Sequence, residues 1–166
     1  MLRILFTATF LCALAVTPVL ADTAKSLGRF EDWEAFTYSD KTGRICYAAS
    51  LPKRSLNSFK GRGEAYVSVT NRQADKSFGV ISVTLGYAAK KDAPAELDVG
   101  GAKFDLYTTG DTAWARNDKA IVQAMLKGGS VVVHGTPTKG EQTADTYSLN
   151  GFAKAFGEIG KTCPEK

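Results

Sequence analysis

EAYVSVTNRQADKSFGVISVTLGY, residues 64–87, is the stretch that decides the fold. Apolar and polar side chains alternate through residues 64–71, and they alternate again through residues 78–87. A period of two is typical of strands that keep one face in a core and the other toward water. Both segments are therefore predicted to be strands.

Six further segments predict strands, either by the same alternation or by their strand-forming residues. They are residues 33–38, 44–49, 96–99, 102–108, 130–136 and 143–149. Gly100 and Gly101 separate two of these segments, and a Gly-Gly pair suits a tight hairpin because both residues adopt positive φ easily.

Residues 118–127 carry apolar side chains at helical spacing instead. Asn117 directly before them is a suitable N-cap, and Gly128 directly after them can end a helix in the left-handed conformation. A first helix is therefore predicted over residues 118–127.

Residues 150–160 predict a second helix, because Phe152, Phe156 and Ile159 repeat at the spacing of a single helical face. We expect that face to point into the core. About eight strands with two packed helices, at 118–127 and 150–160, describe a mainly β fold. It is expected to be an antiparallel β-sandwich or a partly closed barrel.

The first 21 residues have the three parts of a secretory signal peptide. Arg3 supplies the positive charge, residues 4–16 form an apolar run, and Ala21 ends a cleavage site of small residues. This run is shorter than the roughly 20 apolar residues that a membrane-spanning helix needs. We therefore expect residues 1–21 to be removed on export, which leaves no transmembrane anchor.

Removal of that peptide leaves a loose N-terminal leader, residues 22–30, and a single β domain, residues 31–166. We expect the protein in the periplasm, with secretion or association with the outer surface also open. Cleavage also removes Cys12, so that Cys46 and Cys163 are the two cysteines left. Two cysteines in an exported protein predict an intramolecular disulfide, with a free pair or an intermolecular bridge as the alternatives.

The sequence offers little for catalysis. His134 is the only histidine, so no metal site is expected, and no phosphate-binding glycine loop is present. Asp105, Asp111 and Asp145 could supply a general acid and a general base, although exposed strand carboxylates are the ordinary interpretation. We therefore expect no enzyme and no cofactor.

One cluster of cations gives a candidate interaction surface. Lys53, Arg54, Lys60 and Arg62 fall within ten residues that contain no acid. Such a segment suits anionic glycans or lipopolysaccharide at the cell envelope or a host surface, and its alternative is a solvated loop between strands. The formal net charge of +4 is too small to indicate a nucleic-acid partner.

Several stretches in order resemble a known family. They are Asp32-Trp33, Arg44 to Ser50 with Pro52, Arg62-Gly63, Gly86-Tyr87, Phe104-Asp105-Leu106, Ala113-Trp114-Ala115, Ala124-Met125 and Thr143 to Phe152. Together they resemble the invasion-associated locus B family of exported Gram-negative proteins, over nearly the whole mature chain. The resemblance implies export, but it supplies no catalytic residues to transfer. Some members carry an additional N-terminal cysteine pair that is missing here, which argues against transferring the invasion role and leaves that role open for this chain.

Three functions are compatible with these residues. The first is an exported, non-catalytic binding protein of that family type, acting on an unknown component of the envelope or host surface. The second is a periplasmic small-ligand carrier with a pocket near Trp114, Asp145 and Tyr147, residues that core packing also explains. The third is an unrecognised envelope hydrolase. An enclosed apolar pocket would favour the carrier, and an exposed patch would favour the binding protein. A cleft with two opposed carboxylates would favour the hydrolase.

Overall fold

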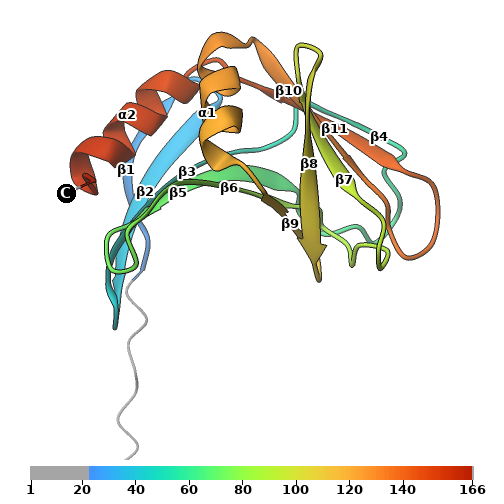
Figure 1. Ribbon diagram of the computed structural model, residues 1–166, viewed down its shortest axis with the longest axis horizontal. Helices are drawn as coiled ribbons and strands as arrows, with labels where there is room; N and C mark the ends of the chain where they lie inside the picture. The colour runs from blue at the N-terminus through green and yellow to red at the C-terminus, as the bar shows by residue number, and fades with distance from the viewer. Residues whose placement is uncertain (1–22, 166) are drawn as a thin grey trace, which may run out of the picture.

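The computed structural model describes residues 23–165 as one antiparallel sheet of eleven strands with two helices (Figure 1). The strands are β1 (Lys25–Phe30), β2 (Trp33–Asp40), β3 (Gly43–Ser50), β4 (Arg54–Leu56), β5 (Tyr66–Arg72), β6 (Ser77–Thr84), β7 (Ala95–Val99), β8 (Ala102–Thr109), β9 (Thr112–Ala115), β10 (Ser130–Gly135) and β11 (Thr143–Ser148). The helices are α1 (Asp118–Lys127) and α2 (Phe152–Thr162). The predicted mainly β fold with two helices is confirmed. The predicted signal peptide lies outside the described residues.

The sheet has more strands than expected, and it is not closed into a barrel. Its order is β1-β2-β3-β5-β6-β9-β8-β7-β10-β11-β4, so β1 and β4 are its two free edges within residues 23–165. The segment 22–30, expected to be a loose leader, contains β1, which pairs antiparallel with β2. Because β1 is an edge strand with little burial on either face, it lacks the alternation by which the other strands were recognised.

The two helices cover one face of half of the sheet. In Figure 1, β2, β3, β5 and β6 arch beneath α1 and α2, while β7, β10, β11 and β4 form the other half of the sheet. Helix α2 packs on β1, β2, β3 and β5, and α1 packs on β6 and β7. Within residues 23–165, neither helix covers the opposite face of the arch, and neither is long and apolar enough to span a membrane.

The core lies between the helices and this arch. Val67, Val69, Ile81 and Val83 alternate into it as predicted, and all four are fully buried. Trp33 joins the arch to α2 and β11. Its ring centroid lies 4.8 Å from that of Phe152, and its Nε1 donates a hydrogen bond to the Ser148 carbonyl oxygen at 2.9 Å.

Of the predicted turn and cap residues, Gly100, Gly101 and Asn117 behave as expected, and Gly128 does not. Gly100 and Gly101 take φ of 59° and 94° between β7 and β8, and the side chain of Asn117 caps α1 with a bond of 3.1 Å. Gly128 does not end α1 in the left-handed conformation, because its φ is −86° and its backbone is extended. Glycine is still needed there, since a Cβ would lie 2.6 Å from Cγ1 of Val99.

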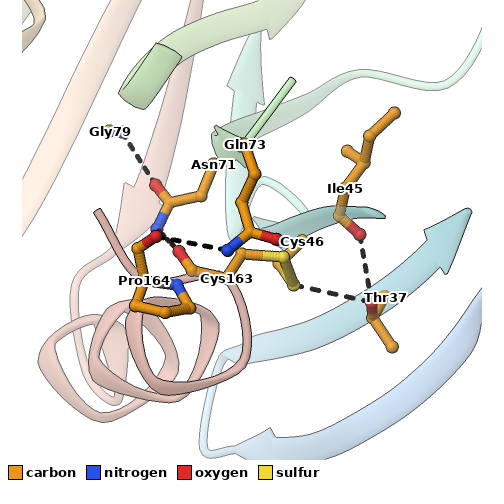
Figure 2. Close-up of a disulfide and its surroundings, with 8 residues drawn as sticks. All are labelled: Thr37, Ile45, Cys46, Asn71, Gln73, Gly79, Cys163 and Pro164. Carbon is orange, nitrogen blue, oxygen red and sulfur yellow. Dashed lines mark hydrogen bonds between the residues drawn. A yellow bond between two sulfur atoms is a disulfide. The ribbon is translucent and has the colours of Figure 1, made fainter. Parts of the chain in front are cut away.

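The predicted disulfide Cys46–Cys163 is confirmed (Figure 2). It links two cysteines that are 117 positions apart in the sequence. The Cα atoms are 5.9 Å apart, and both cysteines are fully buried. Asn71 on β5 donates to the Cys163 carbonyl oxygen at 3.3 Å and accepts from the Gly79 N–H at 2.8 Å. The C-terminal end of α2 is therefore fixed covalently to β3 and by hydrogen bonds to β5.

The face of α2 enters the core less completely than predicted. Phe152 and Ile159 are at most 1% exposed, but Phe156 is only partly buried. Phe156 lies against Gly79, a strand position that has no side chain to cover the ring, and it stacks on Phe152 with centroids 5.8 Å apart. It therefore marks the margin of the core.

Candidate binding groove

The four cations of the predicted interaction surface do not share one environment. Arg54 and Lys60 are exposed. Lys53 is also exposed, but its Nζ lies 2.5 Å from a carboxylate oxygen of Asp32. The side chain of Arg62 is only 5% exposed. The cationic surface is therefore smaller than predicted, and Arg62 has to be assigned to the interior.

Arg62 is paired with Asp145 of β11, whose side chain is fully buried. Its Nη1 donates to Oδ1 of Asp145 at 3.0 Å, and its Nη2 donates to Oδ2. Its Nε and Nη2 also donate to the Leu85 carbonyl oxygen at 2.9 and 2.8 Å. Burial opposes the charge on Arg62, but the hydrogen bond and charge of Asp145 outweigh it and raise the pKa of Arg62. This bidentate pair ties the segment before β5 to the core.

Two glycines allow that pair to form. The N–H of Gly63 donates to the Gly86 carbonyl oxygen at 2.8 Å. Gly86 has a φ of 75°, and a Cβ there would lie 2.4 Å from the Gly63 carbonyl oxygen. The close approach leaves Cζ of Arg62 5.1 Å from the ring centroid of Tyr87. The motifs Arg62-Gly63 and Gly86-Tyr87 are thus two sides of one structural contact.

Two buried tyrosines near this pair differ in their hydrogen bonds. The Tyr87 hydroxyl and Oγ1 of Thr143 share a hydrogen bond of 2.6 Å. The Tyr147 hydroxyl has no partner within residues 23–165, although the side chain is fully buried. Burial raises the pKa of Tyr147, and the charge of Asp145 raises it further.

The pocket predicted from Trp114, Asp145 and Tyr147 is not formed. Asp145 and Tyr147 point into the core from β11. Trp114 is half-buried on the opposite side of the sheet, because its neighbour Ala113 takes the core position on β9. Only Trp114 of the three therefore faces a surface where a ligand could bind.

Trp114 lines an open groove of about 880 Å³ on the uncovered face of the arch. The register of the strands builds this groove. On one row across the sheet, Ala49, Ser68, Ser82 and Trp114 are successive partners on β3, β5, β6 and β9. Along this row the floor over β5 and β6 is formed by the small side chains Ser68 and Ser82, and the large ring of Trp114 stands at one end of the row on β9.

The second wall of the groove is aromatic and comes from β2 and β3. Phe36 and Tyr47 are cross-strand partners, and their rings stack with centroids 5.0 Å apart. Tyr38 meets Tyr47 edge to face at 6.1 Å. Tyr66, at the start of β5, adds a further ring that is 36% exposed. Together with Trp114, these rings make the aromatic groove, a name we use below for this surface.

The charged groups that line the aromatic groove are mostly paired with one another. The ion pairs are Arg29 with Glu34 at 2.5 Å, Lys53 with Asp32 at 2.5 Å, and Arg72 with Asp75 at 3.8 Å. The hydrogen bond from Lys53, followed by that from Ser148, lowers the pKa of Asp32. Glu31 and Glu64 add further acid, so the lining holds no excess of positive charge.

This groove was missed in the sequence, although a signal for it is present. Phe36, Tyr38 and Tyr47 occupy the strand positions that alternate with core residues such as Ala35 and Cys46. Aromatic side chains at solvent-facing positions of neighbouring strands are unusual enough to indicate a binding surface. The depth of the groove, in contrast, depends on which strands are neighbours, and the local pattern does not contain that information.

The other residues considered for catalysis lie apart from the groove. Asp105 and Asp111 are exposed. His134 and Asp105 line a smaller cleft of about 330 Å³, with Glu96 held by Lys103 at 2.7 Å. In the part of the chain that the structure describes, no three His, Cys, Asp or Glu side chains gather as metal ligands.

Comparison with known proteins identifies the family. The family model described as invasion associated locus B (IalB) protein matches residues 33–160. Among solved structures, invasion associated protein B from Bartonella henselae is similar in fold, with 18% identity and a TM-score of 0.57 over 84% of this chain and 97% of that one. No curated protein matches the chain. The family match spans most of the chain and includes the strands of the aromatic groove, and the chain therefore belongs to the invasion associated locus B family.

Proposed function

We propose that this chain is an exported, non-catalytic binding protein that holds a component of the cell envelope or of a host surface in its aromatic groove. The observation that supports this proposal is the groove itself. Five aromatic side chains, Phe36, Tyr38, Tyr47, Tyr66 and Trp114, line one open face of the sheet. Rings left at a surface in this number are typical of interaction sites, because they contribute large contact areas at low entropic cost.

The openness of the groove favours binding of an extended partner over carriage of a small ligand. A carrier encloses most of the surface of its ligand in a largely apolar pocket. Here the interior next to β11 is filled by core side chains, including Tyr147 and Leu149, and the groove lies outside on the far face of the sheet.

The surroundings of the acids favour a non-catalytic role. Asp145 is held by Arg62 in the core and so is not free to act with Asp105 or Asp111 as an acid–base pair. Asp32 and Glu34 at the groove are bonded to Lys53 and Arg29. These contacts occupy Asp32, Glu34 and Asp145, which are therefore poorly placed to act as a general acid and a general base.

The buried disulfide supports the proposed export. Bonds such as Cys46–Cys163 form and persist in oxidising compartments, of which the bacterial periplasm is one. The disulfide agrees with the signal peptide predicted for residues 1–21. Periplasmic residence and onward secretion are both compatible with it.

A second, anionic contact is a separate candidate on the same molecule. Arg54 and Lys60 are exposed near the edge strand β4 and could meet lipopolysaccharide phosphates or anionic glycans. Because only these two cations of the predicted cluster, together with the paired Lys53, are exposed, we propose this contact as an addition to the groove and not as the main site.

The test is co-sedimentation of the disulfide-intact protein with isolated cell envelopes and, separately, its binding to intact host cells. We expect saturable binding to one of these surfaces, reduced roughly tenfold in affinity by Trp114→Ser or Tyr66→Ser. Leu126→Ser is the matched control, since Leu126 is exposed to a similar degree on α1. Arg54→Gln with Lys60→Gln should weaken binding only at low salt. Absence of binding to both surfaces, or equal binding by the groove variants, would contradict the proposal.

A further inference from the structure

We infer that the occupant of the aromatic groove is an uncharged polysaccharide chain. This inference rests on the proposed function and adds the chemical class of the ligand. It is carried by three features of the groove: its width, the pairing of its charges, and the hydrogen-bonding groups that it presents.

The width of the groove suits one extended chain. Strands β3, β5, β6 and β9 are successive neighbours, and three strand spacings of about 4.8 Å separate the backbones of β3 and β9 by about 14 Å. The rings of Tyr47 and Trp114 stand at the two sides of this span, Ser68, Thr70 and Ser82 leave its middle low, and the ring of Tyr66 stands at one end of β5. The result is a trough with ring walls, open above.

The charges of the groove do not favour an ionic polymer. Its three cations, Arg29, Lys53 and Arg72, are each held by a carboxylate of the same lining. A polyanion such as heparin would have to break these pairs and would also meet the remaining acids Glu31 and Glu64. A polycation would find most carboxylates already neutralised. An uncharged ligand keeps every pair intact.

The hydrogen-bonding groups of the groove come from side chains. The backbone N–H and C=O groups of its central strands are committed to the sheet ladder. Among the hydrogen bonds within residues 23–165, none uses the hydroxyls of Tyr38, Tyr47 or Tyr66 or the indole N–H of Trp114, although all four residues line the groove. A ligand that fits must therefore carry many hydroxyl groups and also flat apolar faces for the rings.

A sugar chain has both properties, because each ring presents C–H groups on its faces and hydroxyl groups around its rim. A peptide is less well suited to this site. Extended peptides bind sheets mainly by adding a strand at an exposed edge, where the backbone supplies the hydrogen bonds, and this groove lies on a face. Peptide binding is therefore an outcome that the test must be able to detect.

The experiment titrates the disulfide-intact protein with cellohexaose and with chitohexaose and follows binding by calorimetry and tryptophan fluorescence. Trp33 is fully buried in the core, so a ligand-dependent change in fluorescence reports on Trp114. We expect saturable binding of at least one sugar that changes less than about twofold in affinity between about 0.1 M and 1 M salt, since no charge is involved. Trp114→Phe should lose the fluorescence change but keep most of the measured heat.

The variant Tyr66→Ala should weaken sugar binding roughly tenfold, and Leu126→Ala should leave it unchanged. Circular dichroism of each variant verifies that it is folded. The inference is overturned if neither sugar binds, or if heparin or oligolysine binds instead in a manner sensitive to Tyr66→Ala. If the protein binds envelopes through the groove but neither sugar, the proposed function stands and the ligand class is wrong. If it binds neither envelopes, host cells nor sugars, both proposals fail.

Discussion

At the scale of single residues, the two faces of the sheet differ in whether their polar side-chain groups have hydrogen-bond partners. On the core side, each side-chain nitrogen of the buried Arg62 donates a hydrogen bond to Asp145 or to the Leu85 carbonyl oxygen, so the buried charge is paired. On the outer face, aromatic side chains such as Trp114 line the groove, and their polar groups are available to a ligand. Tyr147 is the exception on the core side, because its buried hydroxyl has no partner within the described residues.

This exception predicts opposite effects for two substitutions that each remove only a hydroxyl. Tyr147→Phe should leave the free energy of unfolding unchanged or raise it by up to about 1 kcal/mol, because no hydrogen bond is lost. Tyr87→Phe should lower it by about 1 kcal/mol, because the bond of 2.6 Å to Thr143 is lost. Urea denaturation measures both. If Tyr147→Phe is the more destabilising of the two, the Tyr147 hydroxyl does have a hydrogen-bond partner, such as a buried water.

At the scale of secondary-structure elements, α2 joins the C-terminal part of the described chain to its first three strands. It packs on β1, β2 and β3, and the disulfide from Cys163 continues that contact to Cys46. Its two stacked phenylalanines give a matched pair for testing how far the core extends. Phe152 is 1% exposed, whereas Phe156 is partly buried at the margin.

We predict that Phe152→Ala costs about 3–5 kcal/mol of unfolding free energy, since it leaves a cavity against Trp33. Phe156→Ala should cost roughly 1–2 kcal/mol, because part of its ring is already in water. Both are measured by urea denaturation of the oxidised protein. Equal costs for the two variants would mean that the core extends over Gly79 and that Phe156 is not marginal.

The sequence predicts these elements well where a regular pattern faces the core. All eight expected strands and both helices are present, because burial on one side imposes a period that residues 64–87 display clearly. β1, β4 and β9 were not predicted for a common reason. They are short or lie at an edge, and they are strands because a neighbour pairs with them and not because of their own pattern.

At the scale of the whole molecule, the candidate groove arises from neighbours that are distant in sequence. Ser82 lies opposite Trp114 because β9 pairs with β6. Strands β7 and β8 lie between them in the sequence, so no local pattern encodes this pairing. Arg62 and Asp145 are 83 positions apart in the sequence. The sequence marked one as a member of a cationic cluster and the other as a strand acid, but not the two as partners. The disulfide was predictable because removal of the predicted signal peptide leaves only one pair of cysteines.

The same architecture gives a way to close the groove without touching the core. Thr70 is half-buried on the floor of the groove, and its neighbours Val69 and Asn71 take the buried positions on β5. Thr70→Trp should fill the trough and reduce envelope or sugar binding roughly tenfold or more. The thermal midpoint should change by no more than about 2 °C, because the new ring lies on the outer face. Thr109→Trp, at an exposed position on β8 outside the lining, should bind as the parent does. If Thr70→Trp also binds as the parent does while remaining folded, the aromatic groove is not the binding site, and the exposed cations Arg54 and Lys60 become the next surface to test.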